Sequence, residues 1–125
     1  MTQDIYADEA KERWGETDSY KQSQRRLAGY SKEDIAKAQQ AMQDATNLVL
    51  EAMKAGLPAN SPEAMSGAEA HRQSISDYWY ECSYQIHTGL ATMYLADPRF
   101  MAHYESQQAG LAKYIHDAIV ANANK

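Results

Sequence analysis

The stretch that decides the fold is residues 31–58, SKEDIAKAQQAMQDATNLVLEAMKAGLP. It opens with Ser31 followed three residues later by Asp34, the spacing of a capping box, with Asp in place of the usual Glu. Gly56 and Pro58 give a stop signal at the other end. Between them, apolar residues recur three, four or seven positions apart, as on one face of a helix: Ile35, Ala38, Met42, Ala45, Val49, Ala52 and Met53. The stretch predicts one long amphipathic helix.

The residue types outside this stretch also favour helices. Val and Ile are scarce, Ala, Gln, Glu, Lys and Met are abundant, and no alternating run or Asn-Gly turn indicates a strand. With 125 residues, 44% of them hydrophobic and 23% charged, the chain is long enough for one ordinary core. We therefore expect one all-α domain.

Further helices are predicted where a capping residue precedes a proline or an apolar stripe. On the helix that Ser61-Pro62 opens, which should end near residue 78, we expect the apolar side to consist of Met65, Ala68, Arg72, Ile75 and Trp79. The last helix should bury Leu111, Tyr114, Ile115, Ala118 and Ile119. The predicted starts are Ser61, Ser83, Asp97-Pro98 and the residue after Gly110.

The first thirty residues are predicted to be weakly held. Short helices are expected at residues 5–14 and at about 18–28, ended by Gly15 and Gly29. In the second, Leu27 is the only aliphatic side chain larger than Ala. Short helices are marginal without packing, so this segment should depend on contacts with the rest of the chain.

Charge and cysteine content narrow the function. A net charge of −5 and an isoelectric point near 5.3 argue against nucleic-acid binding, which requires clustered Lys and Arg. A single cysteine cannot form an intrachain disulfide, and the N-terminus lacks the features of a signal peptide. No run reaches the ~20 apolar residues of a membrane span. We expect a cytoplasmic protein with no membrane partner.

The chemistry concentrates in residues 77–100, DYWYECSYQIHTGLATMYLADPRF, around Cys82. Cys82 directly precedes the expected helix cap Ser83, where free N–H groups could lower a thiol pKa, and His87 could lie nearby. The alternative is a buried, inert cysteine, which from spacing alone is favoured because free cysteines are among the most buried residues.

Seven aromatic side chains between residues 78 and 104 could line a ligand pocket or could pack in the core. Tyr and Trp suit a ligand pocket because they offer a flat face and one polar group, but they also fill cores. Trp79 continues an apolar stripe, so a core position is favoured for it. The seven are Tyr78, Trp79, Tyr80, Tyr84, Tyr94, Phe100 and Tyr104.

No motif supports catalysis or a bound metal. His71, His87, His103 and His116 make neither HxxxH nor HExxH, and there is no CxxC, Gly-rich phosphate loop or GxSxG. We expect no cofactor and no enzymatic activity. Haem ligation by a histidine remains a minor alternative for an all-α fold, and so does a protein-interaction module whose aromatics are core.

Three segments resemble the TipAS family, the antibiotic-recognition domain of certain MerR-type transcriptional activators. They are RWGETDSYKQS at residues 13–23, HRQSISDYWYECSYQIHTGLATMYLADPRF at residues 71–100 and GLAKYIHDAIVANA at residues 110–123. The resemblance implies a globin-like fold without haem, with residues 1–30 as a flexible lid and residues 31–125 as the core. It implies binding of macrocyclic thiopeptide antibiotics or similar natural products, such as the albicidin bound by some relatives.

The resemblance also implies a role for Cys82, since the family's ligand-attached cysteine lies in the same motif, YWYECS here. A thiolate suits conjugate addition to the dehydroalanine of a thiopeptide. Glu81 stands where proline is frequent in the family, and a carboxylate beside the thiol would raise its pKa. The expected ligand-binding residues are Cys82, Tyr80, Tyr84, His87, Trp79, Tyr94, Tyr104, Trp14 and Tyr20.

The winged-helix DNA-binding domain and the coiled coil of the full-length activators have no counterpart in these 125 residues. A stand-alone resistance protein and a piece of a longer activator both fit the acidic charge. In the second case, the longer form could dimerise through that coiled coil.

Overall fold

A computed structural model describes residues 18–125, and these form six helices and no strand. The prediction of an all-α domain is confirmed. The helices are α2 (Asp18–Ala28), α3 (Lys32–Lys54), α4 (Pro62–Tyr78), α5 (Tyr84–Ala96), α6 (Pro98–Glu105) and α7 (Leu111–Ala123). The short helix predicted for residues 5–14 lies outside the described residues.

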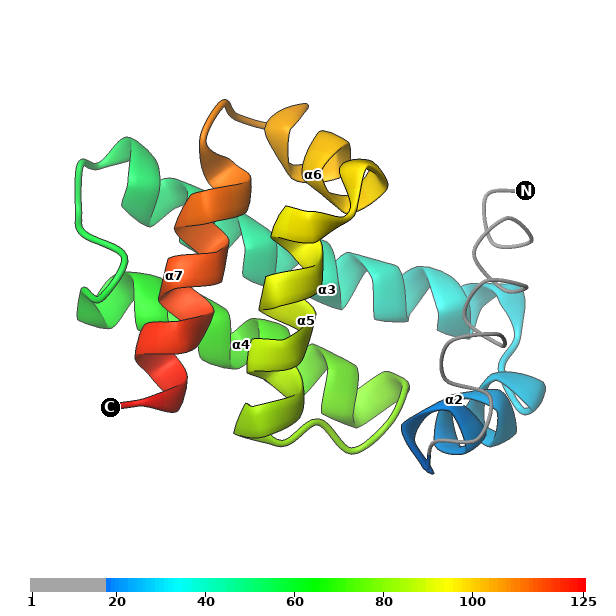
Figure 1. Ribbon diagram of the computed structural model, residues 1–125. Helices are drawn as coiled ribbons and strands as arrows, with labels where there is room; N and C mark the ends of the chain where they lie inside the picture. Colours follow the sequence, from blue (N-terminus) through cyan, green and yellow to red (C-terminus); the bar gives the residue numbers. More distant parts are fainter. Residues whose placement is uncertain (1–17) are drawn as a thin grey trace.

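The helices form two crossing layers (Figure 1). The long α3 runs beside α4, and this pair makes the most extensive contact in the fold. α5 and α7 lie side by side across it, and α6 connects them at one end. α2 lies at the far end of the α3–α4 pair, near the loop between α4 and α5. This loop, residues 79–83, is called the α4–α5 loop below.

The predicted helix starts are confirmed, and the starts of α3, α4, α5 and α6 each have a side-chain cap, whereas α7 starts at Leu111 after a glycine without one. Ser31 and Asp34 make both hydrogen bonds of a capping box. Ser61 caps α4 with Pro62 in its first turn, Ser83 caps α5, and Asp97 caps α6 ahead of its proline. The cap oxygens accept hydrogen bonds from N–H groups that the helix itself leaves without partners.

The core lies between the two layers and is built largely from small side chains. Leu111, Ile115 and Ile119 of α7 are fully buried against Val49 of α3 and a row of alanines. Tyr114, predicted to be buried, is half-buried and its hydroxyl donates to the carbonyl of Leu57 over 2.8 Å. The small residues allow the helices to approach closely, and this sets the shape of the site.

Close approach is most pronounced at Gly67 on α4. A Cβ atom there would lie 2.8 Å from Cγ2 and 2.9 Å from the backbone nitrogen of Val49. Such distances are shorter than van der Waals contact, so glycine is required for α3 and α4 to pack as they do.

The predicted apolar side of α4 is wrong in part. The buried residues are Ala64, Gly67, Ala68, His71, Ser74 and Ile75. Met65, Arg72 and Trp79, which we placed on that side, are only half-buried and lie outside the core cluster. Because α3 and α4 approach each other closely, only small side chains fit between them. The buried face of α4 is therefore not the face that carries its largest apolar residues.

Candidate functional site

Cys82 lies in the α4–α5 loop, and its backbone is fixed on both sides. Its N–H donates to Oγ of Ser76 over 2.9 Å, and its carbonyl accepts from Nη1 of Arg72 over 2.7 Å. The thiol itself donates to the carbonyl of Ser83 over 3.8 Å. The residue is 1% exposed. The loop therefore presents its backbone to polar partners and encloses the sulfur.

Of the two alternatives for Cys82, the buried cysteine favoured from spacing is confirmed, and a thiol pKa lowered by the start of α5 is not found. Burial raises the pKa of Cys82 to about 11, although the positive charge of Arg72 by itself lowers it. At the start of α5, Oγ of Ser83 already accepts the N–H of Ile86. Glu81 is exposed, and the carboxylate that adds to the raised thiol pKa is Glu69. In this closed position the thiol has little thiolate character.

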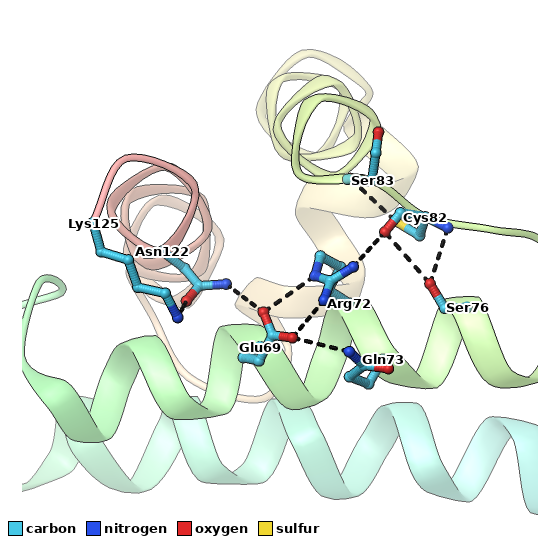
Figure 2. A network of polar contacts seen from close by, with 8 residues as sticks. All are labelled: Glu69, Arg72, Gln73, Ser76, Cys82, Ser83, Asn122 and Lys125. Carbon is cyan, nitrogen blue, oxygen red and sulfur yellow. Dashed lines mark hydrogen bonds and ion pairs between the residues drawn. The ribbon is translucent and has the colours of Figure 1, made fainter.

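A polar network joins the Cys82 backbone to α4 and α7 (Figure 2). Glu69 accepts from Nε of Arg72 over 3.1 Å and from Nη2 over 2.5 Å. It also accepts from Gln73 and from Asn122, each over 3.0 Å. The hydrogen bonds from Arg72, above all, lower the pKa of Glu69 to about 2. The carboxylate is therefore ionised across the physiological pH range.

Two buried tyrosines, Tyr80 and Tyr94, lie near enough to Cys82 to interact with it electrostatically. Burial raises the pKa of Tyr80 and of Tyr94, and the nearby Cys82 adds to both effects. The rings of Tyr94 and Tyr104 lie 5.1 Å apart, and burial raises the pKa of Tyr104 to about 12. The structure thus brings together four of the predicted site residues: Tyr80, Cys82, Tyr94 and Tyr104. All three tyrosines are neutral at pH 7.

A buried pair of histidines, His71 and His87, is in contact with Tyr94 through His71. Nδ1 of His71 and Nε2 of His87 are 2.9 Å apart, and the two side chains are 0% and 1% exposed. Burial lowers the pKa of His71 to about 4 and that of His87 to about 3. Nε2 of His71 is buried without a hydrogen-bond partner in the described structure. His71 also packs edge-on against Tyr94, with ring centres 6.0 Å apart.

Sequence reasoning singled out His87 and missed His71. The signal was present, since His71 lies three residues after Ala68 and four before Ile75 on the buried face of α4. The two imidazoles bond to each other, and this arrangement gives no support to haem ligation. Among the described residues, no group of three or more His, Cys, Asp or Glu side chains could hold a metal ion.

The other predicted site residues lie further out. Tyr84 is 40% exposed, with the guanidinium carbon of Arg72 4.3 Å from the centre of its ring. Trp79 is half-buried at the end of α4 and meets Tyr30 edge-on, with ring centres 6.2 Å apart. Tyr20 is half-buried on α2. Trp14 lies outside the described residues.

α2 is attached to the segment that leads into Cys82. Arg26 donates to the carbonyl of Ser76 over 2.6 Å, and the Tyr30 hydroxyl donates to the carbonyl of Tyr78. The N–H of Glu81 donates to the side-chain oxygen of Gln22 over 3.0 Å. Since α4 has no basic residue in its last turn, Arg26 supplies a positive charge at the negative end of that helix.

An open depression of about 480 Å³ lies between α5 and α7, beside the exposed Tyr84. None of its lining residues is charged: Tyr84, Gln85, Thr88, Gly89, Thr92, Val120, Ala123 and Asn124. Cys82 is not among the residues that line this depression.

No helix of the described part of the chain is long and apolar enough to span a membrane.

Fold and site together define an all-α domain of the globin-like class, with a buried cysteine near two tyrosines in a loop to which the helix α2 is attached. The chain belongs to the TipAS antibiotic-recognition domain family, whose family model matches residues 6–122.

Curated relatives support this membership. The chain is 45% identical over 120 residues to the HTH-type transcriptional activator TipA of Streptomyces coelicolor. It is 27% identical over 118 residues to the HTH-type transcriptional activator mta of Bacillus subtilis. These matches cover 96% and 94% of this chain but 47% and 45% of the relatives, so the chain spans about half their length.

Two solved structures are similar to this one. TipAS of Streptomyces lividans in complex with the thiopeptide nosiheptide matches 98% of this chain and 85% of its own, with 44% identity and a TM-score of 0.90. The antibiotic-binding domain of a TipA-class multidrug resistance transcriptional regulator matches 70% of this chain and 93% of its own, with 42% identity and a TM-score of 0.64.

Proposed function

We propose that this domain binds and sequesters bulky peptide-like antibiotics of the thiopeptide class. The observation that carries the proposal is the match over 98% of the chain, at a TM-score of 0.90, to a TipAS domain solved with nosiheptide. As part of a longer MerR-type activator the domain would be the drug-sensing effector in the cytoplasm, and alone it would be a resistance protein. Its action is stoichiometric capture without turnover.

The ligand would be held between the N-terminal segment and residues 77–104. The tyrosine and tryptophan side chains of this region suit a ligand made of aromatic heterocycles, since they stack on flat rings and can hydrogen-bond to polar edges. Residues 1–30 are proposed to act as a lid. Arg26 and Tyr30 donate hydrogen bonds to the 76–81 segment and Gln22 accepts one from it, and these contacts give α2 a fixed point of attachment from which such a lid would close.

Covalent attachment at Cys82 is the narrower part of the proposal. A thiopeptide dehydroalanine would accept the sulfur at its β-carbon: the S–C bond forms, the C=C electron pair moves to the α-carbon, and that carbon takes a proton from solvent. The thiol loses its own proton to solvent base. With a pKa of about 11 and 1% exposure, the thiol must leave its enclosed position before it can react.

Titration with nosiheptide and thiostrepton, followed by tryptophan fluorescence and thermal shift, tests binding, because a specific ligand stabilises the fold by mass action. We expect saturable changes in both signals at a one-to-one ratio. No change with either compound or with other macrocyclic antibiotics would contradict the proposed function.

Intact-mass spectrometry after the same incubation tests the covalent step. We expect one added ligand mass in the wild type and none in Cys82→Ser, which should still give the fluorescence change. An adduct that persists in Cys82→Ser would show that the ligand attaches elsewhere.

A further inference from the structure

Arg72 uses its whole guanidinium group at the site (Figure 2). Nε and Nη2 bind the two carboxylate oxygens of Glu69, over 3.1 and 2.5 Å. Nη1 donates to the carbonyl of Cys82 over 2.7 Å, and the group lies 4.3 Å from the centre of the Tyr84 ring. The side chain is only 15% exposed. It thus connects α4, the α4–α5 loop and the start of α5.

The partner of Arg72 is itself anchored. Glu69 accepts from Nδ2 of Asn122 on α7 over 3.0 Å, and Lys125 donates to Oδ1 of the same asparagine over 2.8 Å. A planar guanidinium can bind a carboxylate with two nitrogens, donate with a third and stack on a ring at once, which an ammonium group cannot do. Arg72 is therefore held in one orientation, with Nη1 directed at the Cys82 carbonyl.

Arg72 is also the positive charge that acts on the thiol. Burial is the main cause of the raised pKa of Cys82, Arg72 opposes it, and Glu69 adds to it. The same side chain therefore has two effects of opposite sign on reactivity. It keeps the loop closed, which hides the sulfur, and it favours the thiolate once the sulfur is reached by an electrophile.

We propose that Arg72 is the positioning residue of the capture site: it holds the Cys82 backbone in place and puts a positive charge at the loop that carries the sulfur. This inference rests on the proposed function, in which Cys82 adds to an electrophilic antibiotic. It assigns the control of that step to a residue on α4 that lies ten positions before the cysteine.

Two measurements separate the two effects. Amide hydrogen exchange of the 79–83 loop reports its opening and does not depend on the fraction of thiolate. Alkylation of Cys82 by iodoacetamide at pH 8, in which an S–C bond forms and iodide leaves, reports opening multiplied by the fraction of thiolate. Neither measurement needs an antibiotic, so failure here is distinguishable from failure of the proposed function.

The variants are Arg72→Lys and Arg72→Met. Arg72→Lys keeps the positive charge but loses the planar guanidinium that binds Glu69 and the Cys82 carbonyl together, and Arg72→Met loses both the charge and these hydrogen bonds. We expect faster loop exchange in both. Alkylation should be fastest in Arg72→Lys, and Arg72→Met should lag behind it by about three- to ten-fold, the effect expected of one nearby charge. Loop exchange at the wild-type rate in both variants, or equal alkylation in the two, would overturn the proposal.

Two further variants serve as controls. Lys113→Met removes an equal charge at an exposed position of α7 and should leave both measurements at the wild-type value. Ser76→Ala removes the partner of the Cys82 N–H without changing any charge, so it should raise exchange and alkylation together. If Arg72→Met does not fold, Arg72→Lys carries the test, and loop exchange at the wild-type rate in that variant would overturn the proposal.

Discussion

Acidification should destabilise this domain through its buried histidine pair. His71 and His87 are neutral in the folded state, with pKa values lowered by burial to about 4 and about 3, against an ordinary value of 6.5. In the unfolded chain both take up protons as the pH falls below 6.5. The free energy of unfolding is therefore at its full value above pH 6.5, where the histidines are neutral in both states. It decreases as the pH falls toward 4, because only the unfolded chain takes up the protons.

The size of the effect follows from linkage. At pH 5 an unfolded histidine is nearly all protonated, whereas the folded ones are nearly all neutral, and the difference amounts to about 2 kcal/mol for each ring. Because the rings bond to each other, the two contributions need not add, so the expected loss between pH 7.5 and pH 5 is about 2 to 4 kcal/mol. That is a large part of the stability of a small domain.

The carboxylate with the most lowered pKa does not interfere in this window. The pKa of Glu69 falls from 4.5 to about 2 on folding, so its contribution is present above pH 4.5 and is lost only below that value. The assay is urea unfolding, followed by far-UV circular dichroism at pH 7.5 and pH 5.

The matched variant is His71→Leu/His87→Leu, which replaces both partners of the buried bond by apolar groups of similar size. We expect the wild type to lose about 2 to 4 kcal/mol between the two pH values and the double variant to lose far less. An equal loss in both proteins would refute the reasoning, because the remaining titratable groups are the same.

Three other changes test the fold and the attachment of α2. Gly67→Ala should cost about 1 to 3 kcal/mol in urea unfolding because its Cβ would meet the Val49 backbone, whereas Gly89→Ala, with open space around it, should cost nothing. Tyr30→Phe removes the bond to the Tyr78 carbonyl and should speed amide exchange in α2 while α3 keeps its wild-type rate. Ser31→Ala removes the cap of α3 and should lower the free energy of unfolding by about 1 kcal/mol; no measurable loss would contradict that role.

The helix boundaries were predictable because their causes are local. A cap side chain and a proline act within one turn, so Ser31, Ser61, Ser83 and Asp97 could be read from the sequence. The face that each helix buries was less predictable from the sequence. On α4 the choice of Arg72 over His71 followed side-chain hydrophobicity and spacing, while the packed face follows the close approach of α3 at Gly67.

The sequence by itself determined the all-α class, the helix starts and, through three motifs, the family. It also singled out the tyrosines around Cys82. Only the tertiary structure decided the state of the thiol, since burial and the charges of Arg72 and Glu69 come from other turns of the fold. It alone paired His71 with His87, sixteen residues apart. A pKa depends on which groups and how much water surround an atom, and those are set by packing across elements, not by neighbours along the chain.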